Sequence, residues 1–230
     1  MKIVAVIQAR MGSSRLPGKI MKPIGDTSLI EILIERLSLS KLIDEIVIAS
    51  SETDEDIIFT NYLSDKGYNC INGSEDNVLS RYVKAAKEFN ADVIVRITGD
   101  CPLIDHKIVD EAIKILLKDD LEYCTNTLPS TFPDGLDVEV FTKNLLFEAE
   151  TISETDSELE HVTAAMRTKK DLNFFNIEYK DDLSSLRWTV DELSDYKLVK
   201  KIFHFFSPRI DFSWLEVLNL YNSNPDLFSI

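Results

Sequence analysis

Three cations fall within ten residues, directly after the first apolar run of the chain. They are Arg10, Arg15 and Lys19, and their segment, Gln8–Lys19, also holds two glycines and two serines. Glycines let backbone N–H groups approach an anion closely, and Arg and Lys side chains neutralise phosphate oxygens. Because the chain has a formal net charge of −15, this segment stands out as a site for a phosphate-bearing ligand.

Two familiar phosphate-binding motifs are excluded by spacing. A Walker A loop needs one residue fewer between Gly12 and Gly18, and it needs Ser or Thr where Ile20 stands. The chain also contains no G-x-G-x-x-G sequence, so a dinucleotide-binding fold has no support.

Two aspartates follow apolar runs and are candidates for a metal site. Asp100 comes after Val93–Ile97, and Asp191 comes after Leu186–Val190. A Mg²⁺ ion takes one or two protein carboxylates and completes its shell with water and phosphate oxygens. Mg²⁺ is therefore the expected cofactor. The structural alternatives are a turn-forming role for Asp100, before a Cys-Pro pair, and helix N-capping for Asp191.

The elements that must position these residues alternate through residues 1–120. Strand-like, β-branched runs occupy Ile3–Ile7, Ile46–Ala49 and Val93–Ile97. Helical patterns begin at Ser28 with Glu31 and at Thr53 with Asp56, and continue at Val78–Phe89 and Lys107–Leu117. This alternation predicts βαβ units and a mostly parallel sheet, whose ligands bind beyond the carboxyl ends of the strands. The working loops are then Gln8–Lys19, Ser50–Thr53, Asn72–Asp76 and Thr98–Pro102.

Residues 121–230 are less regular. Strands are expected at Val138–Phe141, Asn173–Tyr179 and Leu186–Val190. Helices are expected at Lys143–Ile152, Asp156–Arg167, Tyr196–Phe206 and Phe212–Tyr221. Since no linker or repeat separates residues 1–120 from residues 121–230, we predict one domain over 1–230. Phe174, Phe175 and Ile177 suit either a homodimer contact or the core.

Six motifs in order carry a resemblance to a known family. The first is Q-A-R-M-G-S-S-R-L-P-G-K at 8–19, and the others are D-N-V-L-S-R-Y at 76–82, T-G-D-C-P-L-I-D at 98–105, D-G-L-D-V-E at 134–139, E-H-V-T at 160–163 and R-W-T-V-D at 187–191. Over nearly its whole length the chain resembles the nucleotidyltransferases that activate sugars, in the branch named for spore-coat polysaccharide biosynthesis protein F. That branch is related to CMP-Kdo synthetases and acylneuraminate cytidylyltransferases. The resemblance implies an α/β, Rossmann-like GT-A nucleotidyltransferase fold, with a mostly parallel central sheet flanked by helices.

The resemblance also implies a nucleotide-binding half (1–120), a sugar-binding and possible dimerisation half (121–230), and roles for individual residues. Arg10, Arg15, Lys19 and Asp100 would be catalytic, and Asp100 and Asp191 would hold the metal. The nucleotide-binding residues would be Gln8, Ala9, Arg10, Gly12, Ser13, Arg15, Lys19, Asn72, Asp76, Val78, Arg81, Thr98 and Gly99. The sugar-binding residues would be Asp134, Gly135, Asp137, Glu139, Glu160, His161 and Arg187. Structural alternatives are a helix N-cap for Asp76, a turn at Asp134 and an exposed position for His161.

The expected reaction is attack of a sugar oxygen on the α-phosphorus of an NTP, with release of pyrophosphate. CTP and an anionic sugar are implied by the resemblance, and the nucleophile is either a sugar phosphate or an anomeric hydroxyl. A glycosyltransferase of related fold is the first alternative, although such enzymes use a D-x-D motif and rarely need a cationic triphosphate loop. A nucleotide sensor or inactive scaffold is the second alternative.

Composition excludes several classes of protein. With 25 Lys and Arg against 40 Asp and Glu, the chain repels nucleic acids and anionic membranes. An odd number of cysteines (Cys70, Cys101 and Cys124) without C-x-x-C spacing argues against a disulfide framework and a cysteine zinc site. The N-terminal apolar run is too short for a signal peptide, and no stretch approaches the ~20 apolar residues that span a bilayer. We therefore predict a cytoplasmic location.

Overall fold

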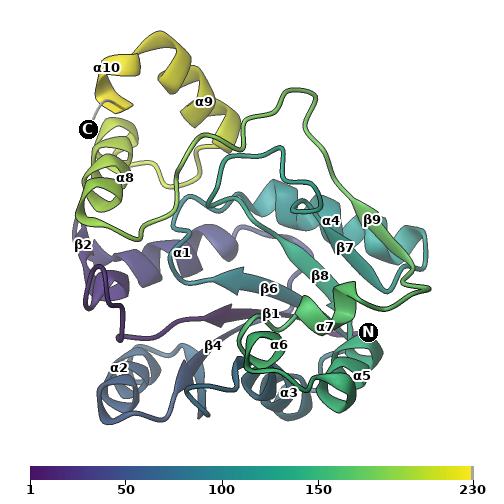
Figure 1. The fold of residues 1–230 in the computed structure, drawn as a ribbon. Helices are drawn as coiled ribbons and strands as arrows, with labels where there is room; N and C mark the ends of the chain where they lie inside the picture. The colour runs from purple at the N-terminus through teal and green to yellow at the C-terminus, as the bar shows by residue number, and fades with distance from the viewer. Residues whose placement is uncertain (229–230) are drawn as a thin grey trace.

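A seven-stranded sheet forms the centre of the molecule (Figure 1). The computed structural model describes residues 1–228. In spatial order the strands are β5 (Asn69–Gly73), β4 (Glu45–Ser51), β1 (Ile3–Gln8), β6 (Val93–Thr98), β8 (Glu139–Thr142), β7 (Tyr123–Thr125) and β9 (Phe174–Asn176). Neighbouring strands are parallel except where β8 meets β6 and β7. The predicted α/β fold with a mostly parallel sheet is therefore confirmed.

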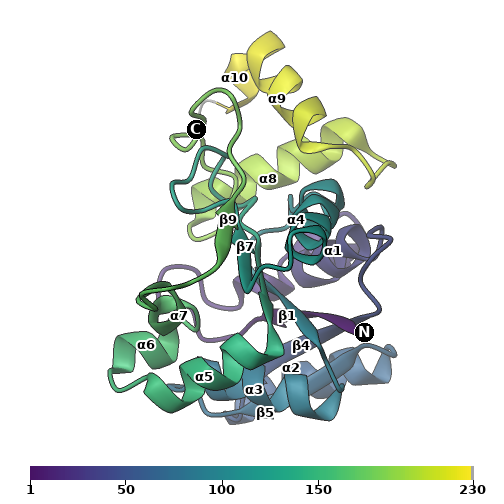
Figure 2. The same cartoon turned by 90° about the vertical axis from the view of Figure 1, so that its right-hand side faces the viewer.

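Helices cover both faces of this sheet. In chain order they are η1 (Lys19–Met21), α1 (Leu29–Leu37), α2 (Asp54–Asp65), α3 (Val78–Glu88), α4 (His106–Lys118), α5 (Lys143–Ile152), α6 (Asp156–Glu160), α7 (Ala164–Arg167), α8 (Leu193–Phe206), α9 (Trp214–Ser223) and α10 (Pro225–Phe228), and a small hairpin joins β2 (Pro23–Ile24) to β3 (Thr27–Ser28). Figures 1 and 2 show α1 and α4 on one side of the sheet and α3 and α5 on the other. No described helix has the length and apolarity that crossing a bilayer requires.

The alternation of side chains along β1 explains the two layers. Ile3, Ala5 and Ile7 belong to the core cluster that contains the apolar residues of α1 and α4. Val4 and Val6 belong to the cluster that contains those of α3 and α5. Successive side chains of a strand point to opposite faces, so one fully apolar strand can serve both layers.

The predicted helix starts are confirmed, and the two capping alternatives for cleft aspartates are wrong. Ser28 and Glu31 form a reciprocal capping box, and the Thr53 hydroxyl accepts from a backbone N–H of α2. Helix α3 is capped by Asn77, the neighbour of Asp76. Helix α8 is capped by Glu192 and not by Asp191.

Two elements of the second half differ from the prediction. The expected helix over Asp156–Arg167 is divided into α6 and α7, because Val162 has a positive φ of 49°. The expected strand Leu186–Val190 is wrong. Among the described residues it forms one isolated β-bridge, between Arg187 and Asp134, and its other backbone hydrogen bonds are with loop residues. The Val190 N–H, for example, donates to the Asp100 carbonyl at 2.8 Å.

Short and polar strands were not predicted. β5 carries the sequence Asn-Cys-Ile-Asn-Gly, and β7 is three residues long. Neither has a run of apolar residues long enough to signal a strand, so pairing with β4 and β8 decides their conformation.

Candidate active site

A cleft of about 820 Å³ opens where β1 and β6 end. Twelve of the residues predicted to bind nucleotide line it, namely Gln8, Ala9, Arg10, Gly12, Ser13, Arg15, Lys19, Asp76, Val78, Arg81, Thr98 and Gly99. Asp100, Glu160, His161 and Asp191 line it as well. β1 and β6 are parallel neighbours, with Gln8 paired to Thr98, so their carboxyl ends deliver both loops to the same place.

Gly99 lets these two loops approach each other. A Cβ atom at Gly99 would lie 2.8 Å from the Ala9 Cβ and 3.0 Å from the Gln8 carbonyl oxygen. The Gly99 N–H donates to that carbonyl at 2.8 Å. The floor of the cleft is thus backbone packed on backbone, where a larger residue at position 99 would push the loops apart.

Lys19 joins the two aspartates predicted to bind a metal. Its Nζ atom donates to Asp100 Oδ2 and to Asp191 Oδ1, each at 2.8 Å. Burial alone would lower the pKa of Lys19, but the two aspartates, Asp100 foremost, outweigh it and raise that pKa. Two carboxylates from distant parts of the chain, Asp100 and Asp191, therefore converge on one positive charge.

Asp100 and Asp191 can be compared with the ligands that a divalent cation requires. Among the described residues, no group of three or more His, Cys, Asp and Glu side chains could hold a metal. Mg²⁺, however, is commonly bound through one or two protein carboxylates plus substrate phosphates. Asp100 and Asp191 supply hard oxygen ligands that already face one cationic point, the Lys19 ammonium, so the donor set fits Mg²⁺.

Asp191 also receives two guanidinium groups. Arg15 Nη2 lies 2.9 Å from its Oδ2, and Arg187 Nη2 lies 2.8 Å from the same atom. Burial would raise the pKa of Asp191, but Lys19, Arg15 and Arg187 lower it. Arg15 lines the cleft, whereas Arg187 is not among the lining residues.

Asp195 is a supporting residue that the sequence interpretation missed. Arg187 donates to both of its carboxylate oxygens at 3.2 Å, and the Asp191 N–H donates to Oδ2 at 2.9 Å. Arg187 and Asp191 precede α8, so helical spacing does not relate them to Asp195 and the sequence carried no signal for this contact. Ser14, Ile20, Glu75 and Asp156 also line the cleft without having been predicted.

The cationic loop is closed on itself and anchored to α2. The Gly18 N–H donates to the Met11 carbonyl at 3.1 Å, with Gly18 at a positive φ of 64°. The Met11 N–H donates to the buried carboxylate of Asp56 at 2.6 Å. Arg10, which is half exposed, pairs with Glu75 at 3.5 Å. The backbone of the loop is therefore fixed while its cations face the cleft.

The predicted sugar residues fall into two groups. Glu160 and His161 line the cleft from the α6 side, whereas Asp134, Gly135, Asp137 and Arg187 lie outside its lining. At Gly135, with φ 107°, a Cβ atom would lie 2.6 Å from the Thr189 nitrogen. Gly135 thus allows the close backbone contact that places the segment before Asp191. Burial, aided by Asp134 and Glu139, raises the pKa of Asp137 to about 6.

Glu139, expected to border the sugar, is instead buried beneath the cleft. It accepts hydrogen bonds from Arg96, from Arg167 Nη2 at 2.6 Å, from Thr163 Oγ1 at 2.8 Å and from the Tyr123 hydroxyl. Burial opposes ionisation, but Arg96 and Arg167 lower its pKa to about 2. All its acceptor capacity is used within the protein, and it ties α7 to the sheet.

Asn72, expected to bind nucleotide, is likewise occupied elsewhere. Its Oδ1 accepts from Thr60 Oγ1 at 2.9 Å, and its Nδ2 donates to the Ser51 carbonyl at 2.6 Å. It therefore holds β5 against α2 and β4, and it does not line the cleft.

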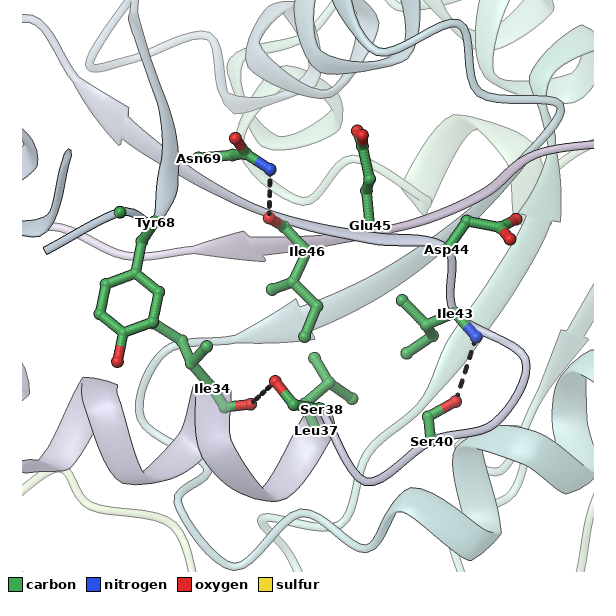
Figure 3. Close-up of a pocket in the computed structure, with 11 residues that line it drawn as sticks. Ile34, Leu37, Ser38, Ser40, Ile43, Asp44, Glu45, Ile46, Tyr68 and Asn69 are labelled. Carbon is green, nitrogen blue, oxygen red and sulfur yellow. Dashed lines mark hydrogen bonds between the residues drawn. The ribbon is translucent and has the colours of Figure 1, made fainter.

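A smaller pocket of about 340 Å³ lies at the opposite edge of the sheet (Figure 3). It is formed by the amino ends of β4 and β5 and the last turn of α1; the Tyr68 ring lies beside Ile34, and the Asn69 amide donates to the Ile46 carbonyl. None of the described residues that line it is Lys or Arg. It lacks the charge that a triphosphate requires, so the cleft is the candidate active site.

A cationic loop after the first strand faces two convergent aspartates at the end of a mostly parallel sheet, which is the arrangement expected for a nucleotidyltransferase. A sequence model described as "Cytidylyltransferase" matches residues 4–193. The chain belongs to this cytidylyltransferase family.

One related protein and two solved structures support the same family. The chain is 34% identical to the spore coat polysaccharide biosynthesis protein SpsF of Bacillus subtilis, over 97% of this chain and 95% of that protein. A solved cytidylyltransferase from Leptospira borgpetersenii is 36% identical, with a TM-score of 0.94 over 99% of this chain and 97% of that one. A CMP:2-keto-3-deoxy-manno-octonic acid synthetase, solved in complex with CTP, shares the fold at a TM-score of 0.71 and 18% identity, over 90% of this chain and 100% of that one.

Proposed function

We propose that the protein transfers CMP from CTP to an anionic sugar, with release of pyrophosphate, in the synthesis of a surface polysaccharide. The observation that carries the proposal is the arrangement of Lys19, Asp100 and Asp191 beneath the Arg10–Lys19 loop. The relatives named above support CTP and the polysaccharide.

In the proposed reaction, the cations of the loop bind the leaving part of the nucleotide. Arg10, Arg15 and Lys19 would contact the β- and γ-phosphates and stabilise the charge that develops on pyrophosphate. Asp100 and Asp191 would hold Mg²⁺, which supplies charge neutralisation at phosphate oxygens. The protein thus acts mainly by positioning and electrostatics.

The chemical step makes one bond and breaks one. A sugar oxygen bonds to the α-phosphorus, and the bond from that phosphorus to the oxygen bridging to the β-phosphorus breaks, so that its electron pair leaves with pyrophosphate. A sugar phosphate would attack as an anion, whereas an anomeric hydroxyl would also release its proton, to solvent water. Glu160 and His161 are the cleft residues proposed to face the sugar.

Two further proposals concern the setting of the enzyme. Its three cysteines are free thiols, which supports a reducing compartment, the cytoplasm.

Phe174 and Phe175 are 47 and 46% exposed on the edge strand β9, while Ile177 is buried. A homodimer through this edge would cover both rings, and analytical ultracentrifugation would show it as a species of twice the 26.2 kDa chain mass.

A pyrophosphate-release screen tests the function. The four NTPs are each combined with sugar 1-phosphates and with 3-deoxy-2-ulosonic acids. We expect release with CTP and one class of anionic sugar, and a loss of about 10³-fold or more in Asp100→Asn. Near-normal turnover in that variant would remove Asp100 from the metal site. Sugar transfer from a nucleotide-sugar donor without pyrophosphate would favour a glycosyltransferase, and tight NTP binding without turnover would favour a sensor.

A further inference from the structure

The turn between α6 and α7 carries two residues of the cleft wall, Glu160 and His161. The next residue, Val162, is fully buried in the core cluster that contains the apolar residues of α3 and α5, and its φ is 49°. The Thr163 N–H donates to the His161 carbonyl, which closes a γ-turn about Val162. Figures 1 and 2 show α6 and α7 beside α5. Consecutive residues of this turn thus serve the cleft and the core.

The backbone of Val162 is strained. A positive φ is an outlier for a β-branched residue, and a γ-turn with a positive φ at its central residue is rare. The sequence over Asp156–Arg167 favours a single helix, in which Val162 would have a negative φ. A residue in such a conformation persists only where its surroundings impose it. Contacts of the neighbouring residues must therefore hold the turn.

Two side chains that follow the turn bind the same buried carboxylate. Thr163, which is 2% exposed, donates from its hydroxyl to Glu139 Oε1 at 2.8 Å. Arg167 Nη2, from the last residue of α7, donates to the same oxygen at 2.6 Å. Glu139 is itself fixed, because Arg96 and the Tyr123 hydroxyl also donate to it. The chain is therefore fastened to β8 immediately after the turn and again at the end of α7.

The cationic loop is anchored by other contacts. The Met11 N–H donates to the carboxylate of Asp56 at 2.6 Å, and the Gly99 N–H donates to the Gln8 carbonyl at 2.8 Å. Neither contact involves the turn. Loosening the turn should therefore displace the wall that carries His161 while the cationic loop stays in place.

We propose that Thr163 is a positioning residue, whose hydroxyl bond to Glu139 maintains the γ-turn at Val162 and so sets Glu160 and His161 against the acceptor sugar. The proposal rests on the proposed function, in which Glu160 and His161 face the sugar. It separates the two substrates, because the loss of the Thr163 hydroxyl weakens binding of the sugar and leaves binding of CTP unchanged. A role in folding alone would lower the amount of active enzyme and would change neither KM.

The kinetic test uses three variants. Thr163→Val keeps the branched shape and removes the donor, whereas Thr163→Ser keeps the donor. We expect the KM for the sugar to rise about 10-fold in Thr163→Val, the value of one hydrogen bond, and to return close to wild type in Thr163→Ser. The dissociation constant of CTP, measured by calorimetry, should stay within about 2-fold in both. Arg167→Met removes the second donor from a side chain that is 35% exposed, so it should raise the same KM even if Thr163→Val does not fold.

Hydrogen exchange over Asp156–Arg167 provides a readout that needs no substrate. Exchange in this segment should become faster in Thr163→Val and stay at the wild-type rate in Thr163→Ser. The matched control is Ser40→Ala, which also removes a hydroxyl donor from a buried carboxylate, that of Asp110. Ser40 lies at the smaller pocket, so this variant should leave the sugar KM and the exchange rate unchanged.

The proposed function and the role of Thr163 fail by different results. Absence of pyrophosphate release by the wild-type protein with any sugar would remove the proposed function. In a wild-type protein that is active, an unchanged sugar KM in folded Thr163→Val and Arg167→Met would overturn the role of Thr163. Unchanged hydrogen exchange over Asp156–Arg167 in Thr163→Val would overturn it as well.

Discussion

Replacing Lys19 by Met removes the ammonium that joins Asp100 to Asp191. Its Nζ lies 2.8 Å from an oxygen of each aspartate, and the three side chains are 12, 27 and 19% exposed. Removing one member of a buried ion pair costs about 3–5 kcal/mol, because the remaining charge loses its partner. Arg15 and Arg187 still contact Asp191, so we expect a loss of about 3 kcal/mol in the free energy of unfolding at pH 7.

Urea unfolding with and without Mg²⁺, in the absence of nucleotide, measures this loss. In Lys19→Met no ammonium stands between the two carboxylates, so Mg²⁺ should restore part of the stability by binding the folded state. Wild-type protein should respond weakly, because the ammonium occupies the same position. Lys114→Met, at an exposed lysine of α4, is the control. A Lys19→Met protein as stable as wild type, or one indifferent to Mg²⁺, would refute the reasoning.

The acid response of the same variant provides a second readout. Lys19, Arg15 and Arg187 hold the pKa of Asp191 below its ordinary value of 3.8. A lowered carboxyl pKa stabilises the fold above that value, and the stabilisation is lost as pH falls through the folded-state pKa. Without Lys19 the folded-state pKa rises, so acid unfolding should begin at a higher pH than in wild type.

Three further substitutions test features beneath the cleft. Because the pKa of Asp137 is raised to about 6, the stability of the fold falls as pH rises from about 4 through 6. Asp137→Asn should therefore gain about 2 kcal/mol in the free energy of unfolding at pH 8 and nothing at pH 4. Calorimetry that showed the same difference at both pH values would contradict this. Glu139→Gln leaves Arg96 and Arg167 with an uncharged partner and should lose about 3–5 kcal/mol in urea unfolding; wild-type stability would show that the charge is not needed. Gly135→Ala, with its Cβ 2.6 Å from the Thr189 nitrogen, should lose about 3 kcal/mol, whereas Gly67→Ala, at φ 91° with nothing within 4 Å, should lose about 1 kcal/mol. Equal melting temperatures for the two glycine variants would exclude a steric role for position 135.

Features set by neighbours along the chain were predictable from sequence. The side chains of the capping residues Ser28 and Thr53 accept hydrogen bonds from residues three positions further along the chain, so the sequence pattern alone predicts them. The cations at 10, 15 and 19 follow a continuous apolar strand, and strand ends of a parallel sheet share one edge. This is why the lining of the cleft was largely anticipated.

Features set by distant partners were not predictable. Glu139 belongs to an acidic motif that suggests a ligand site, yet its burial depends on Arg96 and Arg167, which are 43 and 28 positions away. Leu186–Val190 has the composition of a strand, but its Trp188 and Val190 N–H groups donate to the loop carbonyls of Asp134 and Asp100 and not to a neighbouring strand.

The contact between Arg96 and Glu139 crosses from the first half of the chain to the second. β6 and β8 are adjacent antiparallel strands, with these two residues directly opposite each other. Arg96 orients Gln8, and Glu139 binds Thr163, close to His161. The pair therefore couples the strand that orients Gln8 to the segment that carries His161, so a substitution at either residue would disturb both walls of the cleft together.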